Sequence, residues 1–209
     1  MKLQLALDVF RLEDALALTE QIKGHIDIIE IGTPFLLEEG MNAVRQFRKT
    51  FPDKKIFADT KIMDAGELET LSAIEAGADY ITVLAVTDIA TVEACVSVAN
   101  EHGREIVADM ICVDDIPSKI ARLEAVGVHG IAVHTGVDQQ REGRTPLDDL
   151  KVMKRHCKNA EVYVAGGISL ATVPLYAELE PDVLIVGGAV GSAENPVDEA
   201  LKLRAKIGK

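Results

Sequence analysis

Charged residues lie inside short apolar runs of this 209-residue chain, where burial is costly unless the charge is paired. Glu30 stands in DIIEIG, and Asp59 and Lys61 stand in KIFADTK. Carboxylates that end neighbouring strands can share one hard cation, because Mg²⁺ commonly takes one or two carboxylates plus substrate oxygens and waters. Glu30 and Asp59 are therefore candidate metal ligands, and Lys61 lies on the same strand face as Asp59. A lysine that only neutralises the carboxylates is the structural alternative.

Further polar residues close or follow such runs: Asp8, Asp64, Asp109 and His134. We expect the polar side chains at strand ends to share one mouth, and Asp8, Glu30, Asp59 and Lys61 together indicate a functional cluster. His134 is a candidate for moving a proton, since imidazole titrates near neutral pH. A histidine that is only hydrogen-bonded into the rim is the alternative.

Two glycine pairs, Gly166-Gly167 and Gly187-Gly188, follow the last two apolar runs. In many barrels the turns after the seventh and eighth strands hold a phosphate through backbone N–H groups and a helix N-terminus. The sequence therefore predicts a phosphate site here. Glycines that only permit tight turns are the alternative.

The elements that must position these residues form one repeated pattern. Helical stretches with apolar residues at three- and four-residue spacing separate eight strand-length runs, which begin at Leu3, Asp27, Lys55, Tyr80, Glu105, Gly130, Glu161 and Val183. Alternating strands and helices predict a parallel sheet, and eight units predict a single-domain α/β fold, a (β/α)8 TIM barrel over residues 1–209. The alternative, an open doubly wound sheet, normally has fewer strands or a glycine-rich first turn.

Helix starts support this register. A capping side chain before a proline is predicted at Thr33-Pro34, Thr145-Pro146 and Asn195-Pro196, and once more between Asp114 and Pro117. The longest departure is the polar loop 134–146, which we expect to be mobile and to close over substrate. Its Arg141 and Arg144 could reach the phosphate, although loop arginines are usually solvated, and the sequence leaves this contact open.

The composition of the chain excludes several classes of binding partner. A formal net charge of -12 disfavours nucleic acid and anionic membranes. No stretch approaches the ~20 apolar residues of a membrane span, and no secretory leader is evident. Cys95, Cys112 and Cys157 are odd in number and lack metal-ligand spacing, so we expect buried, reduced thiols and a cytoplasmic protein.

The segment FADTKIMDAG contains Asp59-x-Lys61-x-x-Asp64, which resembles the D-x-K-x-x-D signature of the orotidine 5'-monophosphate decarboxylase superfamily. It is accompanied, in order, by ALDV at Asp8, EIGTP at Glu30, ADMI at Asp109, HTGVDQQ at His134, VAGGI at Gly166 and VGGAV at Gly187. Together these motifs span nearly the whole chain and resemble the 3-hexulose-6-phosphate synthase branch.

The resemblance implies an Mg²⁺-dependent aldol reaction that joins D-ribulose 5-phosphate and formaldehyde through an enediolate. Glu30 and Asp59 would hold Mg²⁺, and Lys61 would stabilise the developing negative charge. His134 would move the C1 proton, and Asp8 would orient Lys61 or a sugar hydroxyl. Asp109 and the two glycine pairs would bind the substrate and its phosphate. The branch forms homodimers, so Asp64 would reach the partner's site.

Other activities remain as alternatives. The sister 3-keto-L-gulonate 6-phosphate decarboxylases carry arginines where this chain has Val137 and Gly188. Orotidine 5'-monophosphate decarboxylases use no metal, and sugar-phosphate epimerases usually have histidine ligands at strands two and three. A non-catalytic sugar-phosphate sensor would not need a lysine among carboxylates.

Overall fold

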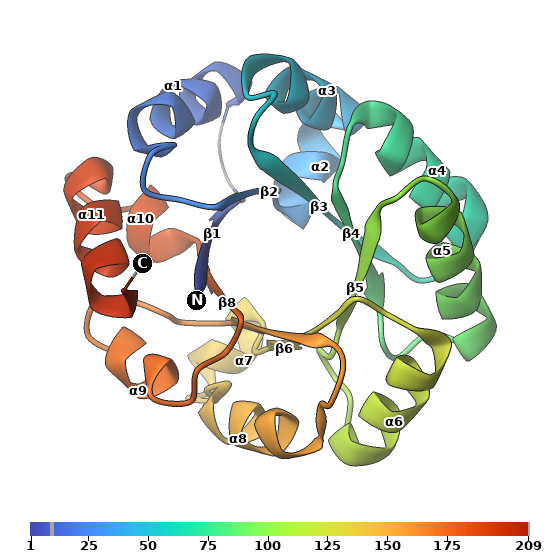
Figure 1. The fold of residues 1–209 in the computed structure, drawn as a ribbon. Helices are drawn as coiled ribbons and strands as arrows, with labels where there is room; N and C mark the ends of the chain where they lie inside the picture. The colour runs from blue at the N-terminus through green and yellow to red at the C-terminus, as the bar shows by residue number, and fades with distance from the viewer. Residues whose placement is uncertain (9–10, 209) are drawn as a thin grey trace.

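A computed structural model describes residues 1–8 and 11–208, and within them the strands close into a parallel barrel ringed by helices (Figure 1). Neighbouring strands follow one another in chain order, and the last pairs with the first. The strands are β1 (Lys2–Leu7), β2 (Ile28–Ile31), β3 (Lys55–Ile62), β4 (Tyr80–Leu84), β5 (Glu105–Asp109), β6 (Gly130–His134), β7 (Glu161–Ala165) and β8 (Val183–Val186). The predicted (β/α)8 barrel is confirmed. Val9, which ends the first predicted run, lies outside the described residues.

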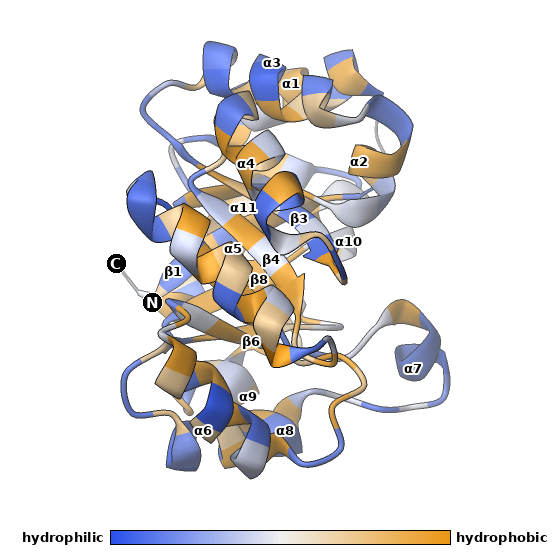
Figure 2. Ribbon diagram, turned by 90° about the vertical axis from the view of Figure 1, so that its right-hand side faces the viewer, coloured by the Kyte–Doolittle hydropathy of each residue, from blue (hydrophilic) through white to orange (hydrophobic). Residues whose placement is uncertain are grey.

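Helices surround the barrel, except that α7 (Val137–Arg141) projects away from it (Figure 2). They are α1 (Leu12–Ile22), α2 (Thr33–Glu39), α3 (Met41–Thr50), α4 (Gly66–Ala76), α5 (Ile89–Glu101), α6 (Ile116–Val126), α7 (Val137–Arg141), α8 (Leu147–His156), α9 (Val173–Ala177), α10 (Gly188–Gly191) and α11 (Pro196–Ile207). Among residues 1–8 and 11–208, none of these helices is long and apolar enough to cross a bilayer.

The core has two layers because successive side chains of a strand point to opposite faces. Aliphatic residues fill the layer between strands and helices. Inward-facing side chains fill the barrel itself: Ala6, Ile28, Phe57, Tyr80, Val107, Ala132, Tyr163, Val183 and Ile185. This packed interior leaves the carboxyl ends of the strands as the face on which polar side chains can gather.

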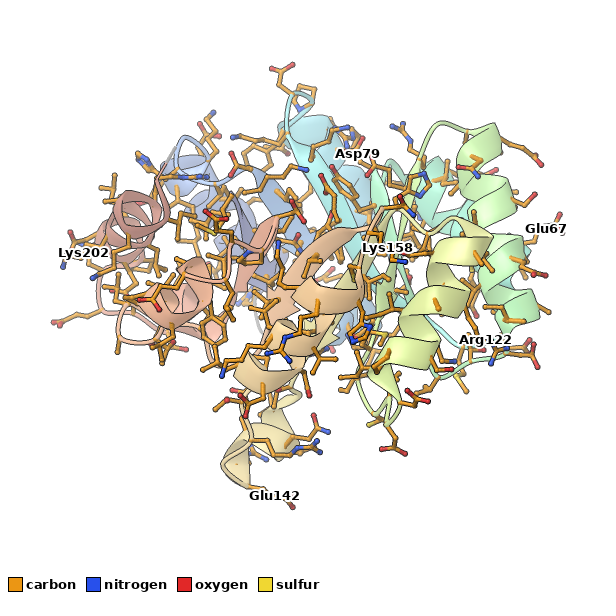
Figure 3. All side chains as sticks on the ribbon, turned by 60° about the horizontal axis from the view of Figure 1, so that its bottom comes forward. Glu67, Asp79, Arg122, Glu142, Lys158 and Lys202 are labelled. Atoms are coloured by element: carbon orange, nitrogen blue, oxygen red, sulfur yellow. The ribbon has the colours of Figure 1, made fainter. Side chains whose placement is uncertain are left out.

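The amino-terminal face of the barrel has its own hydrogen-bond pattern. The residue before each even-numbered strand accepts a backbone N–H from the strand before it, at 2.7 to 3.1 Å; the acceptors are Asp27, Asp79, His129 and Asp182. Figure 3 labels Asp79 at this face, at the opposite end of the view from Glu142, which follows α7. These polar residues hold the barrel together and lie away from the predicted site.

The predicted helix caps are only partly confirmed. Asn195 and Asp115 cap α11 and α6 with their side chains. At α2, however, Gly32 is the N-cap and Thr33 is already helical, and at α8 the N-cap is Pro146 rather than Thr145. The Thr33 prediction failed because its hydroxyl has a stronger partner in the barrel, the carboxylate of Asp59.

The cysteines differ in exposure. Cys95 is buried and Cys157 is half-buried, but Cys112 is exposed, so the prediction of three buried thiols is wrong for Cys112. Cys112 has a φ of 61° and lies in the turn after β5, at the rim of the barrel, where its side chain is outside the core.

Candidate active site

The predicted site residues meet at the carboxyl ends of the strands. A pocket of about 410 Å³ is lined by Asp8, Glu30, Asp59, Lys61, Asp109, His134, Gly166, Gly167, Gly187 and Gly188. Asp64 does not line it, and its exposed carboxylate accepts only the adjacent Ala65 N–H among the described residues. One pocket therefore contains every predicted site residue except Asp64.

An irregularity in β3 shapes the backbone under Lys61. The register between β3 and β4 shifts between Ala58 and Ile62, and Lys61 has a φ of 48°. A non-glycine residue in this region is strained and persists only where its surroundings hold it. The hydroxyl of Thr82 does so by accepting the Lys61 N–H at 2.8 Å. The structure thus fixes the lysine by its backbone as well as by its side chain.

The Lys61 ammonium lies between two carboxylates. Its Nζ donates to Asp59 Oδ2 at 2.7 Å and to Asp109 Oδ2 at 3.0 Å. Burial lowers the pKa of Lys61, but the charges of Asp59 and Asp109 outweigh burial and raise this pKa above its usual value. Lys61 therefore stays charged and can act as a fixed cation rather than as a base.

Asp109 joins the lysine to the histidine. Its Oδ2 also lies 2.9 Å from His134 Nδ1, while its Oδ1 accepts the Ile111 N–H at 2.9 Å. Burial opposes ionisation of Asp109, but the hydrogen bond from His134 and the charges of His134 and Lys61 lower its pKa to about 2. An ionised Asp109 accepts a hydrogen bond from Nδ1–H of His134, so in the neutral ring Nε2 is the nitrogen with the lone pair.

Glu30 and Asp8 are a second group of carboxyl side chains in the pocket, and both interact electrostatically with Asp59 and Lys61. Glu30 is 6 % exposed, and burial together with the neighbouring Asp59 carboxylate raises its pKa to about 8. Burial and Asp59 also raise the pKa of Asp8, with Lys61 and His134 opposing. Asp8 packs against Gly32 and Gly187, and no hydrogen bond to Lys61 is present among the described residues. In the metal-free protein, Glu30 and Asp8 are therefore shifted toward their protonated, neutral forms.

The donor set fits a hard divalent cation. Glu30 and Asp59 supply carboxylate oxygens, and burial together with the charge of Asp59 raises the pKa of Glu30, which a bound cation would lower again. No cluster of three or more acidic, histidine or cysteine side chains arranged for a metal occurs in residues 1–8 and 11–208. A two-carboxylate site that takes its other ligands from substrate and water is consistent with both observations.

The two glycine pairs also line the pocket. Gly166 and Gly167 have φ values of 119° and 66°, which L side chains rarely adopt, and a Cβ on Gly166 would lie 2.6 Å from Thr135 O. Gly188 begins α10, which is only four residues long. The backbone here can approach a ligand closely, as phosphate binding requires, although no long helix points at it.

The loop after β6 contains a short helix, α7, that projects from the body of the barrel (Figure 2). Gly136 N–H donates to Gln139 Oε1 at 3.0 Å, and Gln140 Nε2 donates to Thr135 O at 2.7 Å. Arg141 pairs with Asp138 on the exposed surface of this loop. Arg141 and Arg144 do not line the pocket, whereas Val137 and Gln140 do.

Three site residues have no signal in the sequence. Thr33 and Thr82 donate to Asp59 Oδ2 and Oδ1 at 2.8 and 2.9 Å, and Gln4 donates to Glu30 Oε2 at 2.6 Å. Threonine and glutamine in a strand or helix are ordinary residues. Only the closed barrel shows that these side chains face the carboxylates.

This chain is similar to known proteins over nearly its whole length. Residues 1–203 match the model of the family described as "Orotidine 5'-phosphate decarboxylase / HUMPS family". A 3-hexulose-6-phosphate synthase of Bacillus subtilis (strain 168) is 44% identical over 207 residues, covering 99% of both chains. The crystal structure of a 3-hexulose-6-phosphate synthase from Salmonella typhimurium is 48% identical with a TM-score of 0.97, covering 99% of this chain and 98% of that one. A 3-keto-L-gulonate-6-phosphate decarboxylase structure from Vibrio cholerae is 31% identical with a TM-score of 0.87, covering 99% and 96%.

Proposed function

The chain belongs to the orotidine 5'-phosphate decarboxylase / HUMPS family, and we propose that within it the protein is a 3-hexulose-6-phosphate synthase, an aldolase-type lyase. It would join D-ribulose 5-phosphate and formaldehyde to give D-arabino-hex-3-ulose 6-phosphate. The observation that carries the proposal is the linked set Asp59–Lys61–Asp109–His134, which lines one pocket together with Glu30 and the glycine turns.

The bond changes of this reaction are simple. A C1–H bond of ribulose 5-phosphate breaks, its electron pair forms the bond to the formaldehyde carbon, and a proton ends on the former formaldehyde oxygen. The atoms balance without an oxidant or reductant. The residues must therefore remove one proton, stabilise one negative charge and return one proton.

His134 is suited to both proton transfers. Asp109 holds its Nδ1 at 2.9 Å, which leaves Nε2 to take the C1 proton and later to give a proton to the new hydroxyl group. Lys61 would hydrogen-bond the substrate oxygen on which negative charge develops, in a place its two carboxylates have fixed beforehand. Asp109 would then position both groups, rather than bind substrate as the sequence suggested.

Glu30 and Asp59 would hold Mg²⁺. When bound, Mg²⁺ would supply further positive charge next to the reacting oxygens of the substrate. Gly166, Gly167, Gly187 and Gly188 would bind the phosphate through backbone N–H groups.

We also propose a homodimer in which Asp64 reaches the partner's pocket. Asp64 is exposed next to Met63, and Met63 is 54% exposed. Leu37 on α2 and Leu68 on α4 are 84% and 70% exposed. Apolar side chains at this exposure on neighbouring elements indicate a surface that another protein covers.

The sister activity, decarboxylation of 3-keto-L-gulonate 6-phosphate, is the second candidate, because the barrel also matches such an enzyme. At the two positions where the sister decarboxylases are expected to carry arginines, this pocket is lined by Val137 and Gly188. These residues bring no positive charge, so we place the synthase first.

The test is a direct comparison of both reactions. The purified protein is incubated with Mg²⁺, ribulose 5-phosphate and formaldehyde, and formaldehyde loss is followed; CO₂ release from 3-keto-L-gulonate 6-phosphate is measured in parallel. We expect activity in the first assay that EDTA abolishes and Mg²⁺ restores. Faster CO₂ release would assign the sister activity, and substrate binding without turnover would indicate a sensor.

A further inference from the structure

Gln4 is a fully buried glutamine in β1 whose side chain faces the inside of the barrel. Its Nε2 donates to Glu30 Oε2 at 2.6 Å. In the β1–β2 register Gln4 pairs with Ile28 and Ala6 with Glu30, so Gln4 lies one inward position nearer the amino-terminal face than Glu30. The glutamine therefore supports the carboxylate from beneath the pocket.

Packing alone does not explain a glutamine at this position. The inward-facing neighbours Ile28 and Ile185 are apolar, and Gln4 Oε1 has no hydrogen-bond partner within residues 1–8 and 11–208. An unpaired buried polar group costs about 1–3 kcal/mol. An apolar side chain of the same size would avoid this cost, so the contribution of Gln4 must lie in its bond to Glu30.

The bond to Gln4 fixes one oxygen of Glu30. Rotation about the last torsion of a glutamate is otherwise broad, so a carboxylate without such a partner would sample many orientations. With Oε2 held from below, Oε1 is left for the pocket that Glu30 lines. Groups that orient a metal ligand in this way are typically worth about 10–100-fold in metal affinity.

We propose that Gln4 is a positioning residue, which holds Glu30 so that one carboxylate oxygen is presented to a divalent cation. The inference rests on the proposed function, since it takes Glu30 as a metal ligand. It adds a residue that touches neither substrate nor cation.

The test substitutes Gln4→Met, which keeps the length of the side chain and removes its amide. Mn²⁺ binding to the metal-free protein is measured by electron paramagnetic resonance, and Mg²⁺ binding by calorimetry. Gln21→Met is the matched control, because Gln21 is exposed on α1 and, among the described residues, its side chain bonds only to a backbone carbonyl of the same helix. We expect Gln4→Met to weaken metal binding about 10–100-fold and the control to have no effect.

Thermal unfolding of the metal-free variants separates positioning from a structural role. We expect the Tm of Gln4→Met to differ little from that of the wild type, because the variant loses the unpaired Oε1 and also loses the donor to Glu30 Oε2. A lower Tm with unchanged metal affinity would assign Gln4 a structural role and overturn the inference. Gln4→Asn is the second variant: its shorter side chain cannot reach Glu30, and the same loss of metal affinity is expected.

Metal binding to the wild type distinguishes a failure of the Gln4 inference from a failure of the proposed function. If it binds Mg²⁺ and both Gln4 variants bind equally well, the inference on Gln4 fails and the proposed function stands. If the wild type binds neither cation, the metal site and the role of Gln4 fail together. In a Glu30→Gln background, Gln4→Met should cause no further loss of binding, and a further loss would contradict action through Glu30.

Discussion

His134 Nδ1 lies 2.9 Å from Asp109 Oδ2, the same oxygen that accepts Lys61 Nζ at 3.0 Å. The candidate proton carrier and the candidate fixed cation thus share one carboxylate atom. A change at Asp109 should affect both groups together, which makes this link the most direct point at which to test the site.

Asp109→Asn should reduce kcat by about 100-fold or more, because the variant loses the charge that keeps the proton on His134 Nδ1 and that orients Lys61. The measurement is steady-state formaldehyde consumption, with near-ultraviolet circular dichroism to check folding. Asp138→Asn, on the exposed surface of α7, is the matched control. Loss of substrate affinity with unchanged kcat would instead support a substrate-binding role for Asp109.

Lys61→Met should reduce kcat by roughly 10²–10³-fold, the usual effect of losing one group that stabilises a developing charge. The metal-free variant should also unfold at a lower Tm, since Asp59 and Asp109 lose their shared cation. A variant with unchanged kcat and a lower Tm would show that the lysine only neutralises carboxylates.

The raised pKa of Glu30 leads us to expect that metal binding depends on pH. Burial and Asp59 raise its pKa to about 8 from 4.5, so the metal-free folded protein keeps the Glu30 proton across a pH range in which the unfolded chain releases it. The metal-free protein should therefore lose stability as pH rises from 5 to about 8, relative to Glu30→Gln. Mg²⁺ must displace that proton, so its affinity should rise over the same interval.

Calorimetry in buffers of different ionisation enthalpy measures the protons released when Mg²⁺ binds. We expect proton release below pH 8 in the wild type and less in Glu30→Gln. Binding that is independent of pH and releases no proton would remove Glu30 from the set of ligands.

Gly166→Ala should raise the KM for ribulose 5-phosphate about tenfold or more, because the new Cβ would meet Thr135 O at 2.6 Å in a conformation that disfavours alanine. Inhibition by inorganic phosphate should weaken in parallel. Gly127→Ala is the control: its φ of 88° also lies where alanine is disfavoured, but no atom lies within 4 Å of its Cβ. Equal effects of the two substitutions would argue against a special role for the turn after β7.

The proposed dimer can be tested by complementation. Lys61→Met and Asp64→Asn should each be nearly inactive as homodimers. In a mixed dimer, one pocket combines the intact Lys61 of one chain with the intact Asp64 of the other, so refolding the two together should restore activity. No recovery, in a sample that light scattering shows to be dimeric, would place Asp64 outside the partner's site.

Much of the fold could be predicted because each strand of the barrel is a local apolar run. The eight runs and their order correspond to β1 to β8, and the repeated helical spacing gave the helices between them. Helix caps were less predictable: Thr33 precedes a proline as a cap would, but its hydroxyl bonds to Asp59, 26 residues away. Long-range partners of this kind leave no local pattern.

By itself, the sequence determined which charged residues end the strands, since an acid or a lysine inside an apolar run is visible without coordinates. Only the tertiary structure decided how those residues pair: Asp109 Oδ2 shared by Lys61 and His134, Thr82 bonded to Asp59, and Gln4 placed under Glu30. The physical reason is that closing the barrel brings side chains from different strands within 3 Å of one another, and the register and the irregularity in β3 that select these partners come from packing the whole sheet.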